Sequence, residues 1–501
     1  MQNVLKSIEF GNEAADDTSP KELESYFVEQ DAFGTFLNPD KKLLVVHARK
    51  GVGKSALLKW TAIKQRKVNP ETLVIECRGS DIARDKPITS GSILSPNDQI
   101  SEWMFRLFNL VNRELAELAG IDVANHQSVL VRPTDLAKFK NRNLTEALCD
   151  HLQSMIANGI HASAEALARI KSYKHTWILI DDLDATYQNT PTESISLATF
   201  FSACRYFLQD VKGVSVRVTM RTDVWAMIRR HDESLDKMEQ YVHEILWSQR
   251  DFLSLLASRV KASMIALGLE LPHVPSHVQR MDADERLLQL VFEPRMEWGS
   301  EYRVESLGPQ REVEAYKIFY TLSYERPRWA IQLCKLARES ALNHHAIRIT
   351  KDHIDEIWGE YGAQRIADLV AEHKHQCRQV DELLNAFRGA NRLMTRDELF
   401  NWIRNRISNH LEPRIEGVST RSPRDIAQFL YRIGFILARS ERPDRSYEHY
   451  RFDQMPDFLT SRTDDDFGLK WEIHPCYREA LDIQKLNQSH KERFGRLRKR
   501  Y

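Results

Sequence analysis

The fold of this 501-residue chain is decided by one short stretch, Ala48-Arg49-Lys50-Gly51-Val52-Gly53-Lys54-Ser55. The stretch fits the pattern Ala/Gly-x-x-x-x-Gly-Lys-Ser/Thr, in which backbone N–H groups surround a phosphate. A continuous apolar run at 43–47 precedes it, as is typical of a strand buried on both faces of a parallel sheet. A helix is expected from about Lys54 to Lys67, and its positive dipole end favours an anion at the loop. The order strand, loop, helix therefore predicts a nucleotide-binding α/β domain.

Each position of the loop has an expected role toward a bound nucleotide. The side chain of Lys54 is expected to reach the β- and γ-phosphates, and the hydroxyl of Ser55 to bind Mg²⁺. Alanine stands first in the motif, where the pattern accepts alanine or glycine. ATP and Mg²⁺ are the expected cofactors. The residues expected to bind the nucleotide are Lys50, Gly51, Val52, Gly53, Lys54, Ser55 and Ala56.

A second acidic element follows another buried strand, at 177–180. Carboxylates at the carboxyl end of such a strand lie where α/β sheets bind ligands. We expect Asp181 to hold Mg²⁺ through water, Asp182 to polarise the attacking water, and Asp184 to orient neighbouring groups. The alternative is an ordinary acidic turn. Aspartate at 182, in place of the more usual glutamate, shortens the base and favours slow turnover.

The remaining strands and helices place these motifs in an α/β P-loop NTPase core, a parallel sheet with helices on both faces. Strands are expected at 72–76, 214–220 and 242–245, and the stretch 77–176 has mostly helical periodicity, which predicts a helical insertion. The expected domains are an N-terminal segment leading into the core (1–40), the ATPase core with its insertion (41–248), a helical lid subdomain (249–378), a winged-helix-like domain (379–482) and a basic tail (483–501).

The C-terminal region predicts three helices followed by a β-hairpin, which is the order of a winged helix. Its segment 388–445 contains twelve Arg, no Lys and seven acidic residues, a net charge of +5. Arginine makes forked contacts to phosphates and guanine edges. The alternative is a protein–protein module with a solvated arginine-rich face. The candidate contacts to duplex DNA are Arg421, Arg424, Arg442 and Arg445.

Composition excludes several other classes of protein. Lys and Arg together number 71, as do Asp and Glu, so the formal net charge is zero. This excludes a protein that binds nucleic acid through its overall positive charge. No apolar run approaches the ~18–20 residues of a membrane span, and the N-terminus lacks the features of a signal peptide. The six cysteines form no Cys-x-x-Cys pair. We therefore expect a cytoplasmic protein without a membrane role.

Three features together resemble the KAP and STAND branches of AAA+-like P-loop ATPases. These are the acidic run after the strand at 177–180, the helical insertion between the two phosphate motifs, and the later Arg326-Pro327-Arg328. The N-terminal Phe10-Gly11 and Tyr26-Phe27, with the phosphate loop, look like a bacterial set of such ATPases that is often encoded in anti-phage defence cassettes. The resemblance covers about 9–340 and, more weakly, the C-terminal region. KAP proteins often carry membrane helices in the insertion, and this chain does not.

The resemblance implies roles for several arginines. Arg221 would sense the γ-phosphate, although an ion pair with Asp223 or Asp182 is the alternative. Arg328 would contact nucleotide from the lid, although it could instead cap its helix. Arg229 and Arg230 are candidates for an arginine finger that enters a neighbouring subunit's site, and a solvated helix end is the alternative.

The resemblance also implies an ATP-driven switch that assembles into a homo-oligomer and works with a separate effector protein in defence against phage. Two alternatives stay open at this point. One is a DNA-binding loader or regulator of the AAA+ type that grips duplex DNA through the winged helix. The other is a scaffold that binds ATP and scarcely hydrolyses it.

Overall fold

The computed structural model describes residues 4–83, 95–157, 160, 162–185, 187, 190–229, 233–272, 280–298, 312–442, 447–460 and 468–483. The chain divides into two compact units. One unit is Ala14–Leu246, and the other combines Met1–Glu13 with Trp247–Tyr501. We call them the nucleotide unit and the C-terminal unit.

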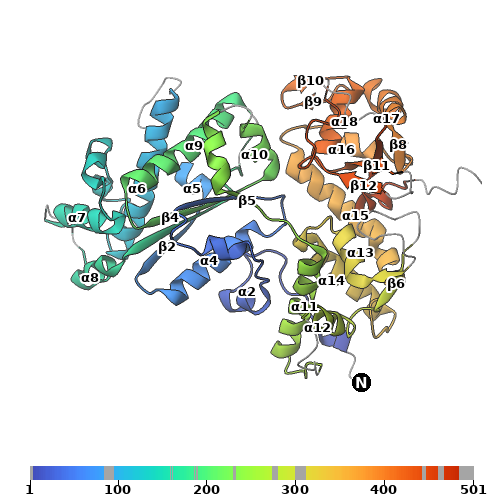
Figure 1. Cartoon of the computed structure of the whole chain (residues 1–501), viewed down its shortest axis with the longest axis horizontal. Helices are drawn as coiled ribbons and strands as arrows, with labels where there is room; N and C mark the ends of the chain where they lie inside the picture. The colour runs from blue at the N-terminus through green and yellow to red at the C-terminus, as the bar shows by residue number, and fades with distance from the viewer. Residues whose placement is uncertain are drawn as a thin grey trace, which may run out of the picture. The chain divides into compact units, whose positions relative to one another are not determined.

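The nucleotide unit is built on a five-stranded parallel sheet in the order β2-β3-β4-β1-β5 (Figure 1). Strand β4 therefore lies between β1 and β3, so that the carboxyl ends of all three meet at one edge. The strands that the apolar runs predicted are confirmed. They are β1 (Leu43–His47), β2 (Thr72–Arg78), β3 (His175–Asp181), β4 (Val214–Met220) and β5 (Val242–Glu244).

Helices cover both faces of this sheet, as the sequence predicts. Figure 1 shows α4 (Lys54–Val68) and α2 (Pro20–Tyr26) on one side and α6 (Pro96–Leu118) and α9 (Pro191–Asp210) on the other. Over the residues that the structure describes, the insertion between β2 and β3 is mainly helical, as predicted. The unit's other helices are α3 (Phe33–Phe36), α5 (Gly79–Ala83), α7 (Leu144–Ile156), α8 (Ala164–Ser172) and α10 (Thr222–Ile228), with 3₁₀ turns at Gln127–Val129, Pro133–Phe139 and Glu233–Tyr241.

A buried arginine in the central strand fixes the chain that leads into β1. The Arg217 guanidinium is fully buried and donates to the carbonyl oxygens of Phe36, Asn38 and Lys41 at 2.8, 2.9 and 2.8 Å. It also lies over the Trp177 ring, 4.5 Å from its centroid. Burial lowers the pKa of Arg217 to about 9, which still leaves it protonated at neutral pH. Backbone carbonyls therefore do for this cation what a carboxylate would do elsewhere.

Arg217→Met is expected to lower the free energy of unfolding of the nucleotide unit by about 3 kcal/mol, because buried carbonyls lose their donor. Urea unfolding followed by hydrogen exchange of β1 and β4 amides measures this unit directly. Arg66→Met is the control, since the Arg66 side chain is 51% exposed, pairs with Glu76 and donates to the carbonyl oxygen of Val74. Equal stabilities of the two variants would show that Arg217 is not a structural anchor.

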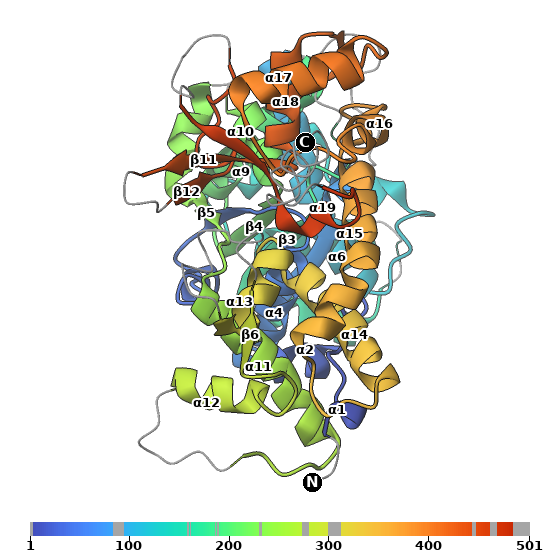
Figure 2. The same ribbon diagram turned by 90° about the vertical axis from the view of Figure 1, so that its right-hand side faces the viewer.

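The C-terminal unit begins with a group of helices, and α14 and α15 lie side by side (Figure 2). Its helices are α1 (Val4–Ser7), α11 (Gln249–Ala266), α12 (Arg280–Leu288), α13 (Ala315–Leu322), α14 (Pro327–Asn343), α15 (Lys351–His373), α16 (Val380–Asn385), α17 (Arg396–Ile403), α18 (Pro423–Arg432) and α19 (Pro475–Arg478), with a π-helical turn at Arg404–Ser408. Two short strands, β6 (Arg295–Glu297) and β7 (Glu312–Glu314), pair antiparallel. Among the described residues, no helix has both the length and the apolar character needed to span a bilayer.

The first residues of the chain belong to this C-terminal unit, whereas the sequence places 1–40 as one segment leading into the ATPase core. Arg338 donates to the carbonyl oxygens of Leu5 and Lys6 at 3.0 and 2.7 Å. Arg259 donates to the carbonyl oxygen of Phe10 at 2.6 Å, and the Phe10 ring packs against Phe292. These contacts attach the N-terminal segment to α11 and α14.

A four-stranded sheet in the order β12-β11-β13-β8 completes the C-terminal unit. Its antiparallel strands are β8 (Leu393–Thr395), β11 (Ile436–Glu441), β12 (Tyr447–Tyr450) and β13 (Lys470–Ile473), and a separate pair is formed by β9 (Arg414–Ile415) and β10 (Val418–Ser419). The predicted hairpin is confirmed as β11 and β12. A capping box of Thr395 and Glu398 begins α17, and the Ser422 side chain caps the start of α18. That this arrangement is a winged helix stays a prediction.

Candidate nucleotide site

The phosphate loop connects β1 to α4 and has the backbone that an anion needs. Gly51 and Gly53 adopt positive φ angles of 80° and 115°, which side-chain-bearing residues rarely adopt. Gly53 is also the residue that precedes α4, so the first N–H groups of the helix point into the loop without a capping side chain. The loop is tied to the sheet because the Ala48 N–H donates to the carbonyl oxygen of Met220 at 3.1 Å.

The side chain of Lys54 folds back over this loop. It is buried, and its Nζ donates to the carbonyl oxygens of Ala48 and Arg49 at 3.0 and 3.4 Å. Ser55 and Ala56 are half-buried in the first turn of α4, Val52 is buried, and Lys50 is exposed. Lys54 is thus held by two neutral carbonyls, which a phosphate can replace as a stronger, charged partner.

Asp181 and Asp182 lie at the end of β3, beside the end of β4. The Thr219 hydroxyl of β4 donates to Asp181 Oδ1, and the Asp182 N–H donates to the same oxygen at 3.0 Å. Asp182 has a positive φ of 46°, which turns the chain sharply after the strand. The Asp182 side chain faces solvent, yet partial burial and the neighbouring Asp181 raise its pKa, while Lys54 acts in the opposite direction. Because β1, β4 and β3 are parallel neighbours, the phosphate loop after β1 and residues 181–184 after β3 lie at the same end of the sheet.

Asp184 and Arg221 form an ion pair next to Asp181 and Asp182, which with Asp184 make up the acidic loop after β3. Arg221 donates to Asp184 Oδ2 from its Nε at 2.9 Å and from its backbone N–H at 3.2 Å. Asp184 is buried, which raises its pKa against the effect of Arg221. Arg221 also lies 3.5 Å from Asp223, one of the two acidic partners that the sequence analysis gave as the alternative. Its role as a γ-phosphate sensor stays a prediction.

Two residues of the site were not identified from the sequence. Thr219 carries the hydroxyl that orients Asp181, and the signal for it was a polar residue near the end of an otherwise apolar strand. Gly79 opens α5 directly after β2, and a Cβ at this position would lie 2.5 Å from the Cα of Leu183. The signal for Gly79 was a glycine at the carboxyl end of a buried strand.

Gly79→Ala is expected to lower ATP turnover at least about tenfold and to destabilise the nucleotide unit by about 1–3 kcal/mol, because the new methyl group displaces the loop that carries Asp182 and Asp184. Steady-state turnover and urea unfolding measure the two effects. Gly34→Ala is the matched control, since no atom lies within 4 Å of its Cβ position. Wild-type turnover in Gly79→Ala would contradict this account of the close approach.

The other arginines that the resemblance singled out are far from residues 181–184 in the sequence. Arg328 is half-buried in the first turn of α14, in the C-terminal unit. Its neighbour Arg326 is buried, pairs with Glu372 at 3.1 Å and lies over the Trp329 ring. Arg229 forms an exposed ion pair with Glu239, and Arg230 lies outside the described residues. The sensor and finger roles stay predictions.

Three of the four candidate DNA-contacting arginines, Arg421, Arg424 and Arg442, have partners inside the C-terminal unit. Arg421 pairs with Glu412 at 3.2 Å, and Arg424 donates to the carbonyl oxygen of Thr460 at 3.0 Å. Arg442 pairs with Glu448 across the hairpin, whereas Arg445 and the tail 484–501 lie outside the described residues. Contact with duplex DNA stays a prediction.

Comparisons with known proteins give only distant structural likenesses. No protein-family model matches the sequence, and no curated protein matches it. The structure of the Aeropyrum pernix ORC2 protein in its ADPNP–ADP complexes is 10% identical, with 96% of this chain and 95% of that chain covered at a TM-score of 0.42. A Walker-type ATPase of Pyrococcus abyssi is 10% identical, with 89% and 97% covered at a TM-score of 0.37. Cdc6p of Pyrobaculum aerophilum is 11% identical, with 94% of this chain and 95% of that chain covered at a TM-score of 0.30.

These TM-scores lie below 0.5, so the fold class rests on the chain's own geometry. A parallel sheet with β4 between β1 and β3, a glycine-rich loop after β1 and acidic residues after β3 together define an α/β P-loop NTPase fold.

Proposed function

We propose that this protein is a Mg²⁺-dependent ATPase. One observation carries the proposal: the strand order brings the phosphate loop with Lys54 and the acidic loop with Asp181 and Asp182 to the same sheet edge, where their charges influence one another. A cation for the phosphates and two carboxylates, one for a metal and one for water, are the parts that phosphoryl transfer needs. The hydroxyl of Ser55 and the carboxylate of Asp181 are hard oxygen donors of the kind that Mg²⁺ prefers.

Each residue then has one task. Lys54 leaves the carbonyls of Ala48 and Arg49 and binds the β- and γ-phosphates as a point charge. Ser55, and Asp181 through water, would hold Mg²⁺, which would neutralise charge on the phosphates. Thr219 fixes the carboxylate of Asp181, and Asp182 accepts a hydrogen bond from the attacking water and orients it.

Finer aspects of the proposal rest on the sequence resemblance. We propose that ATP binding and hydrolysis switch the protein between two states of a homo-oligomer, that a separate effector protein reads this state, and that the setting is bacterial defence against phage. In this scheme Arg328 senses nucleotide from the lid, Arg221 is released from Asp184 toward the γ-phosphate, and Arg229 and Arg230 serve a neighbouring subunit.

The test is steady-state ATP turnover of the purified chain with Mg²⁺, with excess chelator, and with added duplex DNA at moderate salt. If ATP turnover requires Mg²⁺ and its rate is unchanged by DNA, the result supports an ATPase switch with a protein trigger. Stimulation by DNA would favour the alternative of a DNA-coupled loader. ATP binding without turnover under all three conditions would contradict the proposal and favour an ATP-binding scaffold.

A further inference from the structure

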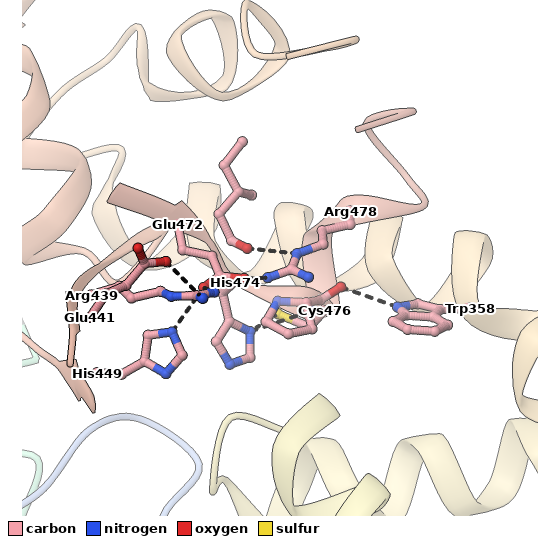
Figure 3. A network of polar contacts seen from close by, with 10 residues as sticks. Trp358, Arg439, Glu441, His449, Glu472, His474, Cys476 and Arg478 are labelled. Carbon is pink, nitrogen blue, oxygen red and sulfur yellow. Dashed lines mark hydrogen bonds and ion pairs between the residues drawn. The ribbon is translucent and has the colours of Figure 1, made fainter. Parts of the chain in front are cut away.

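One face of the C-terminal sheet carries a ladder of charged side chains. Arg439 of β11 lies directly opposite His449 of β12 on one side and Lys470 of β13 on the other. Glu472 lies two residues further along β13 and therefore shares this face. Figure 3 shows the side chains of Arg439, His449 and Arg478 converging on Glu472.

Both oxygens of the Glu472 carboxylate have partners among these neighbours. It is buried, and its Oε1 accepts a hydrogen bond from Arg478 Nη2 at 2.7 Å. Its Oε2 accepts from Arg439 Nη1 at 3.0 Å and lies 2.9 Å from His449 Nε2. The surrounding cations hold its pKa far below the usual range, against the effect of burial. Glu472 therefore stays ionised and has little capacity left for a further guanidinium.

Arg392 is a further arginine in the surroundings of Glu472. Its backbone carbonyl accepts from the Ile473 N–H at 2.9 Å, so it lies beside β13, immediately before β8. Its side chain is 8% exposed, and its Nε and Nη1 have no hydrogen-bond partner among the residues that the structure describes. Burial and the nearby Arg478 and Arg439 lower the pKa of Arg392 to about 10, against the effect of Glu472, so the group is charged at neutral pH. The Nε of Arg439 is likewise buried without a partner in the described part of the chain.

The charges of the described residues around this point do not balance. The cations Arg392, Arg439, Arg478 and Lys470 stand against the carboxylates Glu472 and Glu441, the latter shared by Arg439 and Lys470. Within the described part of the chain, two positive charges are left over. A buried, unpaired guanidinium is costly unless an anion compensates it.

We propose that Arg392, with Arg439 beside it, forms an anion site that takes a dianionic phosphate group. The charge surplus matches a phosphate dianion better than a carboxylate, and guanidinium N–H groups fit phosphate oxygens. The group is either inorganic phosphate or the terminal phosphate of a nucleic-acid strand, which present the same oxygens. The site lies in the C-terminal unit and does not depend on the proposed ATPase activity.

Titration calorimetry of the full chain with inorganic phosphate, at constant ionic strength set with chloride, tests the site. Arg392→Met is expected to weaken phosphate affinity at least about tenfold, the equivalent of one charge-assisted hydrogen bond. The phosphate loop is present in wild type and variant alike, so its contribution cancels. Arg388→Met is the matched control with unchanged affinity, because Arg388 is 54% exposed and pairs with Asp482.

The stability of Arg392→Met separates binding from a merely structural role. Methionine removes an unpaired buried cation, so in phosphate-free buffer the variant is expected to melt at the wild-type temperature or above. Phosphate should raise the melting temperature of the wild type and of Arg388→Met more than that of Arg392→Met. If Arg392→Met fails to fold, Arg392→Lys is used instead, because it keeps the positive charge but lacks the forked guanidinium donors. Its phosphate affinity is expected to be lower than that of the wild type but still measurable.

Two short oligonucleotides of one sequence, with and without a 5′-phosphate, distinguish the sources. Stronger binding of the phosphorylated strand, lost in Arg392→Met, identifies a nucleic-acid end as the source. Binding of inorganic phosphate with no preference between the strands identifies the free ion. Equal phosphate affinity of wild type and Arg392→Met, or no binding of either probe, overturns the proposal.

Discussion

Asp182→Asn is expected to reduce ATP turnover by about 10²–10⁴-fold while ATP binds as in the wild type, since the amide cannot accept a proton from the attacking water. The backbone at this position tolerates the change because asparagine, like aspartate, adopts the positive φ of 46° found here. The change also removes a negative charge beside Asp181 and Lys54, so ATP affinity should hold or rise. Single-turnover hydrolysis and equilibrium binding of ATP measure the two quantities separately.

The acid limb of the pH–rate profile gives an independent reading of the same residue. Water is oriented by the ionised form of Asp182, and burial together with Asp181 raises the pKa of this carboxyl. Turnover should therefore be full at neutral pH and should decline, as pH falls, at a pH above the ordinary range for aspartate.

Asp210→Asn is the matched control for Asp182→Asn, because Asp210 ends α9 and pairs with Lys140 at 3.6 Å on a partly exposed surface. Its turnover and acid limb should equal those of the wild type. Unchanged turnover in Asp182→Asn would show that the base is assigned wrongly and would direct the search to Asp184.

The features of the site that sequence analysis could predict are those encoded within one segment. Gly51, Gly53 and Lys54 form a motif whose backbone demands are local, and the apolar runs at β1, β3 and β4 need no partner to be visible. The acidic loop could be placed for the same reason, because it follows a buried strand directly. Secondary structure and the phosphate loop were therefore accessible before any contact was known.

The remaining features depend on contacts between distant segments. Asp184 meets Arg221, and Thr219 meets Asp181, only because β4 lies between β1 and β3, which the sequence does not state. The close approach of Gly79 to Leu183 likewise requires the packing of two loops. Arg392 was one of twelve arginines in a basic segment, and composition does not reveal which of them is buried without a partner.

Lys54→Ala is expected to weaken ATP binding by about tenfold to a hundredfold and to lower turnover further, since the site loses the charge that contacts the β- and γ-phosphates. The residue is buried in the first turn of α4, and alanine is a strong helix former, so the helix should persist. Calorimetric titration with ATP, and with ADP as a second ligand, measures the loss.

Lys64→Ala is the matched control, because it lies on the same helix and pairs at the surface with Glu29, at 3.0 Å. ADP lacks the γ-phosphate, so if Lys54 contacts both phosphates, the variant should lose more affinity for ATP than for ADP. Equal losses would confine the contact of Lys54 to the β-phosphate. ATP affinity in Lys54→Ala equal to that in Lys64→Ala would refute the phosphate-loop assignment itself, because Lys54 is the buried lysine of the loop, whereas Lys50 is exposed.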